Sequence, residues 1–325
     1  MDGRLKQVLR PIRPQLNEFE ERLKSSLSAR SSFVYQVTEH ILTRRGKRLR
    51  PAFVFLSSGQ MAADPQKAML AALAVELIHT ATLLHDDVID VSSTRRGQAT
   101  VNSKWNNLVS VLMGDYLFSK AFRLLVQAGS VGLLEAFSQA TERVSIGQLV
   151  EIQHINNFDI GEGDYFSLIA DKTASLFAVS CEAGAILAEC GEQEREKIRE
   201  FGEKVGIAFQ ISDDLLDIVG TEAVTGKTVG NDLREGKITL PLIYTLNNGG
   251  SPRKNEILSL LKNGAENGAV EKVARMVQES GGVEYAQKKA LQYGQEAFEL
   301  LSHLPATEFK NSLEEVARFA ALREQ

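Results

Sequence analysis

Apolar residues recur along most of the chain at the three- and four-residue spacing of amphipathic helices. In the stretch from Pro14 to residue 27 they fall on one helical face, at Leu16, Phe19, Leu23 and Leu27. Strand-like alternation is scarce, and so are the Asn-Gly and Asp-Gly pairs that mark hairpin turns. The pattern predicts an all-α protein.

The same spacing predicts helices over residues 14–27, 32–43, 52–61, 65–91, 108–128, 132–156, 163–190, 193–219 and 238–247. Residues 220–236 are rich in Gly, Thr and Lys and predict a loop, and three or four helices follow it as far as Arg323. No low-complexity segment or domain linker interrupts the pattern. We therefore expect a single domain over residues 1–325, a large bundle of about ten to thirteen helices around a central cavity.

Two Asp-Asp-x-x-Asp pentads stand inside apolar helical runs, at Asp86–Asp90 and Asp213–Asp217. Positions i and i+4 of a helix share a face, so the first and last aspartates of each pentad point the same way. Carboxylates among apolar helices are costly to desolvate unless positive charge compensates them. Divalent cations with oxygen ligands supply that charge. The pentads predict a cavity between two helices where metal ions hold a phosphorylated substrate.

One pentad alone is also compatible with a solvated acidic helix end. Asp90 lies near the end of its predicted helix, however, where acidic side chains oppose the helix dipole. A purely structural reason for three aspartates there is poor. The recurrence of the same spacing behind a second apolar run favours the metal site.

Composition narrows the class of protein. With 43% hydrophobic and 24% charged residues among 325, the chain is typical of a globular protein, and its net charge of −5 argues against a nucleic-acid partner. Cys181 and Cys190 form no disulfide framework or zinc site and fit a reducing compartment. No apolar run approaches the roughly 20 residues of a membrane span, and the N-terminus lacks a signal peptide. We expect a cytoplasmic protein; an organelle-targeting peptide already removed stays open.

Basic residues gather in separate segments: Gly46-Lys47-Arg48-Leu49-Arg50-Pro51, Arg95-Arg96-Gly97, Lys172-Thr173, Gly226-Lys227-Thr228 and Glu235-Gly236-Lys237. Guanidinium and ammonium groups commonly hold phosphates, so these segments can bind a diphosphate apart from the metal site. Gly226-Lys227-Thr228 is similar to the end of a P-loop. No glycine lies five residues before Gly226 and no strand precedes it, which excludes that site.

With these motifs in this order, the sequence resembles the trans-isoprenyl diphosphate synthases of the long-chain polyprenyl type, from about Arg45 to the C-terminus. Further matching residues are His79 through Asp90, Gly114-Asp115, Gly147-Gln148, Phe209 through Asp217, and Asn231-Asp232. The resemblance implies the type I isoprenoid synthase fold and a homodimer. It also implies Mg²⁺-dependent head-to-tail condensation of isopentenyl diphosphate with an allylic diphosphate, to give a lipophilic all-trans product.

The resemblance assigns roles to single residues. It implies that isopentenyl diphosphate is bound by Lys47, Arg50, His79 and Arg96, and the allylic diphosphate by Arg95, Lys172, Thr173, Gln210, Lys227 and Lys237. It implies about three Mg²⁺ ions per active site, held mainly by Asp86, Asp90 and Asp213, with Asp87, Asp214 and Asp217 as weaker or water-mediated ligands. The three main aspartates, Lys172 and Lys237 form the expected catalytic set.

The expected chemistry is ionisation of the allylic C–O bond, because metal ions and basic side chains stabilise the leaving diphosphate. The double bond of isopentenyl diphosphate attacks the cation, and the family assigns proton removal to the released diphosphate. No side-chain nucleophile is required, in agreement with the absence of a Ser/His/Asp or Cys/His arrangement.

Product length is expected to depend on an apolar stripe beside the first pentad, formed by Ala74, Ile78, Ala81 and the adjacent Thr82. In the family, a bulky aromatic about five residues before the first Asp blocks the product tunnel; here that position is Ala81, about 7.5 Å along the helix axis from Asp86. Without a plug, a tunnel along this axis predicts about six to ten isoprene units, as in precursors of quinone side chains. A blocking residue on another helix would instead give a short-chain farnesyl or geranylgeranyl diphosphate synthase.

Three other functions deserve comparison. An HD-type phosphohydrolase would use His79 and His85-Asp86 but leaves the second pentad unexplained. A class I terpene cyclase also ionises prenyl diphosphates, yet it would usually lack the Gly-Lys-x-x-Arg-Pro segment and would show a different second metal motif. A non-catalytic subunit of a heteromeric synthase should have lost aspartates, and both pentads are intact.

Overall fold

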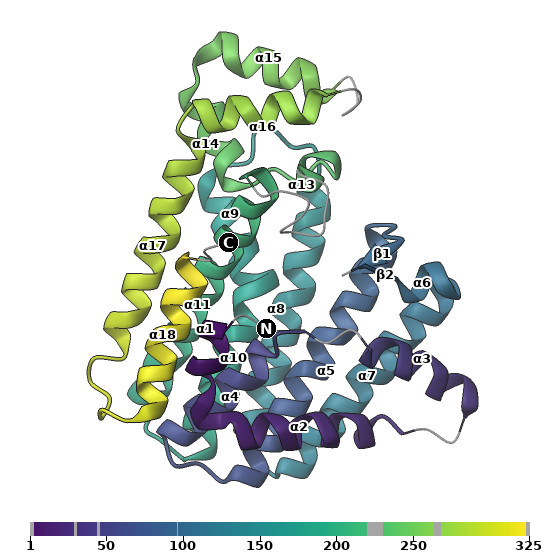
Figure 1. Ribbon diagram of the computed structural model, residues 1–325, viewed down its shortest axis with the longest axis vertical. Helices are drawn as coiled ribbons and strands as arrows, with labels where there is room; N and C mark the ends of the chain where they lie inside the picture. The colour runs from purple at the N-terminus through teal and green to yellow at the C-terminus, as the bar shows by residue number, and fades with distance from the viewer. Residues whose placement is uncertain are drawn as a thin grey trace. The chain divides into compact units, whose positions relative to one another are not determined.

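The computed structural model describes residues 3–28, 31–43, 46–95, 97–219, 230–262 and 268–322. Within these residues the regular structure is helical (Figure 1), apart from strand β1 (Thr94–Arg95), which pairs antiparallel with β2 (Gln98–Ala99). The all-α prediction is confirmed.

The helices follow one another through three parts of the chain. The first part forms α1 (Gly3–Val8), η1 (Arg10–Ile12), α2 (Arg13–Ser26), α3 (Ser32–Leu42), α4 (Leu49–Gln60), α5 (Pro65–Ile89), α6 (Val101–Lys104) and α7 (Asn107–Ala128). The middle part forms α8 (Val131–His154), α9 (Glu162–Ile169), the π-helix η2 (Ala170–Ala174), α10 (Ser175–Leu187), α11 (Glu192–Val219) and α13 (Asn231–Arg234). The last part forms α14 (Leu240–Asn248), α15 (Gly250–Lys262), α16 (Ala269–Glu279), α17 (Gly282–Leu300) and α18 (Glu308–Leu322).

The chain divides into two compact units, each assembled from three separate stretches. Unit 1 comprises Met1–Thr141, Leu176–Gly202 and Leu301–Val316; unit 2 comprises Glu142–Ser175, Glu203–Leu300 and Ala317–Gln325. The first pentad belongs to unit 1 and the second to unit 2. The single domain over residues 1–325 stays a prediction.

Helix α5 is the central helix of unit 1. It packs against α4 and α7, and α2 runs across it (Figure 1). Its N-terminus is capped by Asp64, whose carboxylate accepts the backbone N–H groups of Gln66 and Lys67. Apolar side chains surround α5 on several faces, which is the pattern of a core helix. Among the described residues it is the one helix long and apolar enough, by length and composition, to cross a membrane, and 67% of its most apolar stretch is buried inside the molecule.

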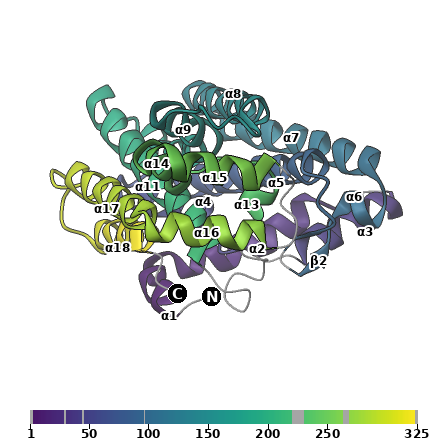
Figure 2. The same ribbon diagram turned by 90° about the horizontal axis from the view of Figure 1, so that it is seen from above.

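Unit 2 has its own apolar core. Helices α14, α15 and α16 pack on one another in sequence, α17 returns along α14, and Figure 2 shows α16 beside α15. The core residues come from α9, α11 and α14 to α17, and include Ile169, Ile211, Leu240, Val273 and Ala286. The α11 residues of this core are Ile207, Ile211, Leu215 and Ile218, and they bury one face of the helix that carries the second pentad.

Three predicted segments differ in detail from the structure. The helix predicted over 163–190 is present but contains the π-helix η2 between α9 and α10. The hairpin Thr94–Ala99 replaces part of a predicted loop, because two-residue strands are too short to show alternation. Helix α13 lies within the predicted loop 220–236, of which residues 220–229 fall outside the described part of the chain.

Candidate active site

The first pentad occupies the C-terminal end of α5. Asp86 and Asp90 are partly exposed, whereas Asp87 between them is 1% exposed. The backbone N–H of Asp90 donates to Asp86 O at 2.8 Å, and that of Ser92 donates to Asp87 O at 3.0 Å, which closes the helix. The helical spacing therefore leaves the first and last aspartates toward the surface and turns the middle one inward, as i and i+4 positions require.

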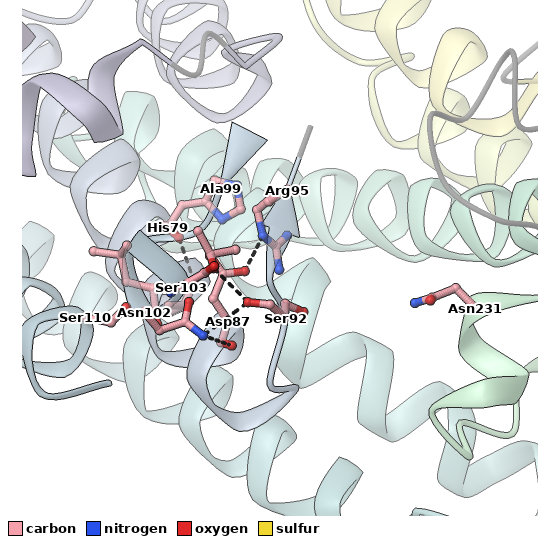
Figure 3. Close-up of polar contacts among 12 residues, drawn as sticks. His79, Asp87, Ser92, Arg95, Ala99, Asn102, Ser103, Ser110 and Asn231 are labelled. Carbon is pink, nitrogen blue, oxygen red and sulfur yellow. Dashed lines mark hydrogen bonds and ion pairs between the residues drawn. The ribbon is translucent and has the colours of Figure 1, made fainter. Parts of the chain in front are cut away.

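Asp87 forms an ion pair with Arg95. Its Oδ1 accepts a charge-assisted hydrogen bond from Arg95 Nε at 2.6 Å (Figure 3). Asn102 Nδ2 donates to the backbone carbonyls of Asp87 and Ser92, each at 3.1 Å, and joins the helix end to the segment after the hairpin. Asp87 thus fixes Arg95, a predicted ligand of the allylic diphosphate. Its proposed weaker role at a metal stays a prediction.

The segment Gly46–Pro51 carries two predicted diphosphate ligands of unit 1. Lys47 is exposed, and the guanidinium of Arg50 lies 4.6 Å from the ring centroid of Phe177. Arg48, between them, has a left-handed backbone with φ of 53° and forms ion pairs with Glu20 and Glu76.

A cavity of about 60 Å³ in unit 1 lies against the face of α5 that holds Glu76, Thr80 and Asp87. Its polar lining is formed by Arg48, Glu76, His79, Thr80, Asp87 and Arg95, and its apolar lining by Leu23, Leu27, Ile41, Leu42, Leu77, Leu83 and Leu84. The structure thus brings together His79 and Arg95, which the sequence assigned to different substrates. Lys47 and Arg50 do not line this cavity.

Gly114 allows α7 to approach α5 closely. A Cβ at this position would lie 2.2 Å from His85 Nε2, so any larger residue would displace the imidazole. His85 Nε2 lies 3.2 Å from Val111 O and 3.5 Å from Asp115 Oδ1. The Gly114-Asp115 motif therefore holds the residue that immediately precedes Asp86.

The second pentad repeats the inward turn of its middle aspartate. Asp213 is exposed and Asp217 partly exposed, whereas Asp214 is 5% exposed. Asp214 accepts hydrogen bonds from the Tyr165 hydroxyl at 2.6 Å and from Gln210 Nε2 at 2.7 Å. Thr173 Oγ1 donates to Gln210 Oε1 at 2.8 Å, which extends the chain of hydrogen bonds to the π-helix.

Burial raises the pKa of Asp214 to about 7, and the charges of Asp213 and Asp217 act in the same direction. The hydrogen bonds from Tyr165 and Gln210 oppose this shift. Burial and the negative charge of Asp214 also raise the pKa of Tyr165, so its phenol remains a donor.

Asp217 caps α13. Its two carboxylate oxygens accept the backbone N–H groups of Asn231 at 3.1 Å and Asp232 at 3.0 Å, and its carbonyl accepts that of Gly230 at 2.7 Å. This contact joins the segment Asn231-Asp232 to the second pentad. The role of Asp217 at a metal stays a prediction.

The π-helix η2 presents Lys172 and Thr173. Gly147 on α8 allows the backbone of η2 to approach α8 closely, because a Cβ at this position would lie 2.5 Å from Lys172 N and 2.8 Å from its Cα. Lys172 Nζ is paired with Glu151, which also accepts a hydrogen bond from Gln148 Nε2 at 3.2 Å. A π-bulge often marks a functional site, and here it carries two predicted ligands of the allylic diphosphate.

One arginine joins α8 to two segments of unit 2 that carry predicted ligands. Arg143 Nε on α8 donates to Asp171 at 2.7 Å, and its Nη2 donates to Glu203 on α11 at 2.6 Å. Asp171 immediately precedes Lys172, and Arg143 lies one turn before Gly147. The carboxylates raise the pKa of Arg143 although burial lowers it, so the group stays charged.

Lys237, the last predicted ligand, forms an ion pair with Glu235 at 2.7 Å. The loop around it is tied to the end of α8, because Asn156 N donates to Gly236 O at 2.8 Å. Arg96 and Lys227, predicted to bind isopentenyl and allylic diphosphate respectively, lie outside the described residues.

The predicted chain-length stripe lies inside unit 1. Ala74, Ile78 and Ala81 are completely buried, and Thr82 is partly exposed with its hydroxyl donating to His79 O at 2.8 Å. The stripe and the cavity-lining residues occupy different faces of α5.

Sequence reasoning missed Arg48, Glu76, Arg143, Glu151 and Tyr165. A signal existed for two of them: Arg48 stands inside a basic motif, and Glu151 follows Gly147 by one helical turn. The others contact site residues that are far away in sequence; Tyr165 and Asp214, for example, are 49 residues apart.

The donors suit a hard cation. Within the described part of each unit, no three His, Cys, Asp or Glu side chains form a metal-binding group. Each pentad instead offers partly exposed or exposed carboxylates, and Mg²⁺ commonly takes one or two carboxylates and completes its shell with water and substrate phosphates. The aspartates present therefore fit Mg²⁺.

Comparisons with known proteins agree with this arrangement. The Polyprenyl synthetase family model matches residues 31–279. The chain is 34% identical to octaprenyl diphosphate synthase of Escherichia coli over 299 residues, covering 92% of this chain and 93% of that one. It is 33% identical to a short chain isoprenyl diphosphate synthase of Methanothermobacter thermautotrophicus over 323 residues, covering 98% and 99%.

The fold is also shared with solved structures. A polyprenyl synthase from Caulobacter crescentus, complexed with calcium and isoprenyl diphosphate, superposes with a TM-score of 0.93 at 32% identity, covering 98% of this chain and 97% of that one. The family model spans most of the chain, and the relatives exceed 30% identity over nearly all of it. The chain therefore belongs to the polyprenyl synthetase family.

Proposed function

We propose that this protein is a Mg²⁺-dependent trans-polyprenyl diphosphate synthase, which adds isopentenyl diphosphate head-to-tail to an allylic diphosphate. The observation that carries the proposal is the shared form of the two pentads. In each, the middle aspartate is buried against protein donors, while the first remains partly exposed or exposed. The chain thus keeps Asp86, Asp90 and Asp213 partly exposed or exposed, with Arg95 in the unit of the first pentad and Lys172 and Thr173 in the unit of the second.

The side chains divide the work between two substrates. Lys47, Arg50, His79 and Arg96 bind isopentenyl diphosphate; Arg95, Lys172, Thr173, Gln210, Lys227 and Lys237 bind the allylic diphosphate. About three Mg²⁺ ions, when bound, neutralise charge on the leaving diphosphate. The aspartates hold the ions, and Lys172 and Lys237 stabilise negative charge on the leaving oxygens.

Product length follows from the small residue at position 81. Ala81 is buried on α5 with Ile78 and Ala74 behind it, and none of the three is aromatic. This supports a long product of about six to ten units, because a tunnel along the helix lacks a plug at this level. Octaprenyl and short chain synthases resemble the chain to a similar degree, so the proposal depends on Ala81.

Assembly as a homodimer is supported by apolar side chains left exposed on two helices. On α7 they are Leu108, Val111, Leu112 and Val126, and on α8 Ile146, Leu149 and Ile152. Exposed apolar patches of this kind are typical of contact surfaces. We propose that the chain acts as one catalytic domain in a cytoplasmic homodimer that supplies lipophilic precursors, for example of quinone side chains.

Incubation of the purified protein with Mg²⁺, farnesyl diphosphate and labelled isopentenyl diphosphate tests this function. We expect a labelled prenyl diphosphate, whose length chromatography determines after dephosphorylation. A cyclic hydrocarbon would identify a terpene cyclase, and the absence of labelled product would contradict the proposed activity.

A further inference from the structure

Arg48 has an unusual backbone for a bulky residue. It stands between Lys47 and Arg50 and has a φ of 53°, in the left-handed region. Side chains with a Cβ adopt this region only where the surrounding structure holds them. Arg48 is also the N-cap of α4, so its conformation sets the direction in which the chain enters that helix.

Two carboxylates from other helices hold the Arg48 side chain. Its Nη1 donates to Glu76 Oε1 on α5 at 2.5 Å, and its Nε donates to Glu20 Oε1 on α2 at 2.8 Å. Glu76 is 6% exposed, so this charge pair is largely withdrawn from water. The guanidinium also lies 5.9 Å from the ring centroid of Phe19.

Glu76 has a counterpart on the same helix. Asp87 lies eleven residues later, about three turns, and therefore on the same face of α5. Each of these buried acids holds an arginine from a basic segment: Glu76 holds Arg48, and Asp87 holds Arg95. All four side chains line the unit 1 cavity together with His79.

We propose that Arg48, held by Glu20 and Glu76, is a positioning residue for the site of isopentenyl diphosphate. It fixes the backbone of Gly46–Pro51 in the conformation that sets Lys47 and Arg50 for the diphosphate. This inference rests on the proposed function. Since Arg48 acts through its two neighbours, its loss should weaken binding of one substrate and leave the other unaffected.

A second ion pair of unit 1 with a buried glutamate provides the control, although its arginine is more exposed (36%) than Arg48 (10%). Arg195 Nε donates to Glu182 Oε1 at 2.6 Å, and Glu182 is also 6% exposed. Both residues of this pair lie within helices, and neither belongs to a basic motif. Glu76→Gln and Glu182→Gln therefore make the same chemical change at equally buried glutamates.

Steady-state kinetics with each substrate varied in turn gives the first test. We expect Glu76→Gln to raise the KM for isopentenyl diphosphate about tenfold, the effect of one weakened charge-assisted hydrogen bond, and to leave the KM for farnesyl diphosphate within about twofold. Glu182→Gln should leave both constants unchanged. Equal shifts of both constants in Glu76→Gln, or no shift, would overturn the inference.

Arg48→Gly removes the side-chain contacts of residue 48 but still allows its left-handed backbone conformation. Glycine adopts a positive φ without strain but offers nothing to Glu20 or Glu76. We expect the same selective rise in KM for isopentenyl diphosphate, whereas Arg48→Lys, which keeps one charged contact, should restore part of the binding. A glycine variant with wild-type constants would contradict the role of the side chain.

Hydrogen exchange followed by mass spectrometry tests, without substrate, whether the contacts of Arg48 hold the backbone of residues 47–52. Peptides covering residues 47–52 should exchange faster in Glu76→Gln than in the wild type and in Glu182→Gln. Unchanged exchange overturns the inference even if the enzyme is active. A wild-type protein that forms no prenyl product, with exchange altered as expected, contradicts the proposed function instead.

Discussion

The two aspartate pentads have the same spacing but bury their middle aspartate against different partners. Asp87 meets the guanidinium of Arg95, whereas Asp214 meets two neutral donors, the phenol of Tyr165 and the amide of Gln210. The first arrangement orders a cation, and the second orders a chain of polar groups that ends at Thr173. One sequence motif therefore organises two different sets of residues that are proposed to bind diphosphate.

The last aspartates differ as well. Asp90 is the C-cap residue of α5, while both carboxylate oxygens of Asp217 accept backbone N–H groups of α13. A carboxylate that caps a helix has lone pairs committed to that helix. The first pentad thus keeps two aspartates oriented toward the surface, and the second keeps chiefly Asp213.

The largest expected effect concerns the first aspartate of each pentad. Asp86→Asn and Asp213→Asn should each lower kcat by about 10²–10³-fold, because each removes a carboxylate that is proposed to hold charge-stabilising ions. Thermal unfolding should change little, since neither side chain is buried. Activity assays at saturating Mg²⁺ measure the effect. A substantial loss in only one of the two variants would break the equivalence of the pentads.

The next effect separates the pentads by stability. Asp87→Asn leaves Arg95 without its charged acceptor and should lower the free energy of unfolding by about 2 kcal/mol, as for a lost hydrogen bond between charged groups. Asp214→Asn should cost much less, because its partners are neutral and the Tyr165 hydroxyl can accept from the new amide while Gln210 still donates to its oxygen. Urea unfolding of both variants at pH 7 measures the difference, and equal losses would contradict it.

A third comparison uses matched alanines. Ala81 and Ala208 each stand five residues before the first Asp of a pentad, and both are fully buried. We expect Ala81→Phe to shorten the product, because the ring lies in the proposed tunnel. Ala208→Phe should overpack the interior and lower stability by about 1–3 kcal/mol without shortening the product.

Chromatography of products and thermal unfolding of both variants distinguish these outcomes. Products of wild-type length from a folded Ala81→Phe enzyme would contradict the long-chain tunnel on α5. Ala81→Ser is the matched control on the same helix, since it adds one hydroxyl without the bulk of a ring.

Local sequence patterns predicted α5, α11 and the shared face of the first and last aspartates of each pentad. Helical spacing depends only on residues a few positions apart. The patterns did not predict which acid would hold which cation. The pair Arg48–Glu76 and the contact Tyr165–Asp214 each join residues far apart in the chain, and the π-helix at Lys172 depends on a glycine of α8. Such features are determined by tertiary packing.

The smallest effect is a difference in pH dependence. Burial raises the pKa of Asp214 from 3.8 to about 7, so between these values the folded protein binds more protons at this site than the unfolded chain does. Stability of the metal-free protein should therefore fall as pH rises through this window, and Asp214→Asn should remove that part of the slope. Thermal unfolding between about pH 3.8 and 7, the span of the two pKa values, measures it with a chelator present.

Asp159→Asn is the control for the Asp-to-Asn substitution itself, because its side chain is 92% exposed. Asp87→Asn should retain the Asp214 contribution as well, since the two pentads belong to different units. If the slope of stability against pH persists in Asp214→Asn, the Asp214 carboxyl does not cause it. The neutral donors would then stabilise the ionised carboxylate as well as an arginine does. The contrast between the two buried aspartates would then be one of geometry and not of charge.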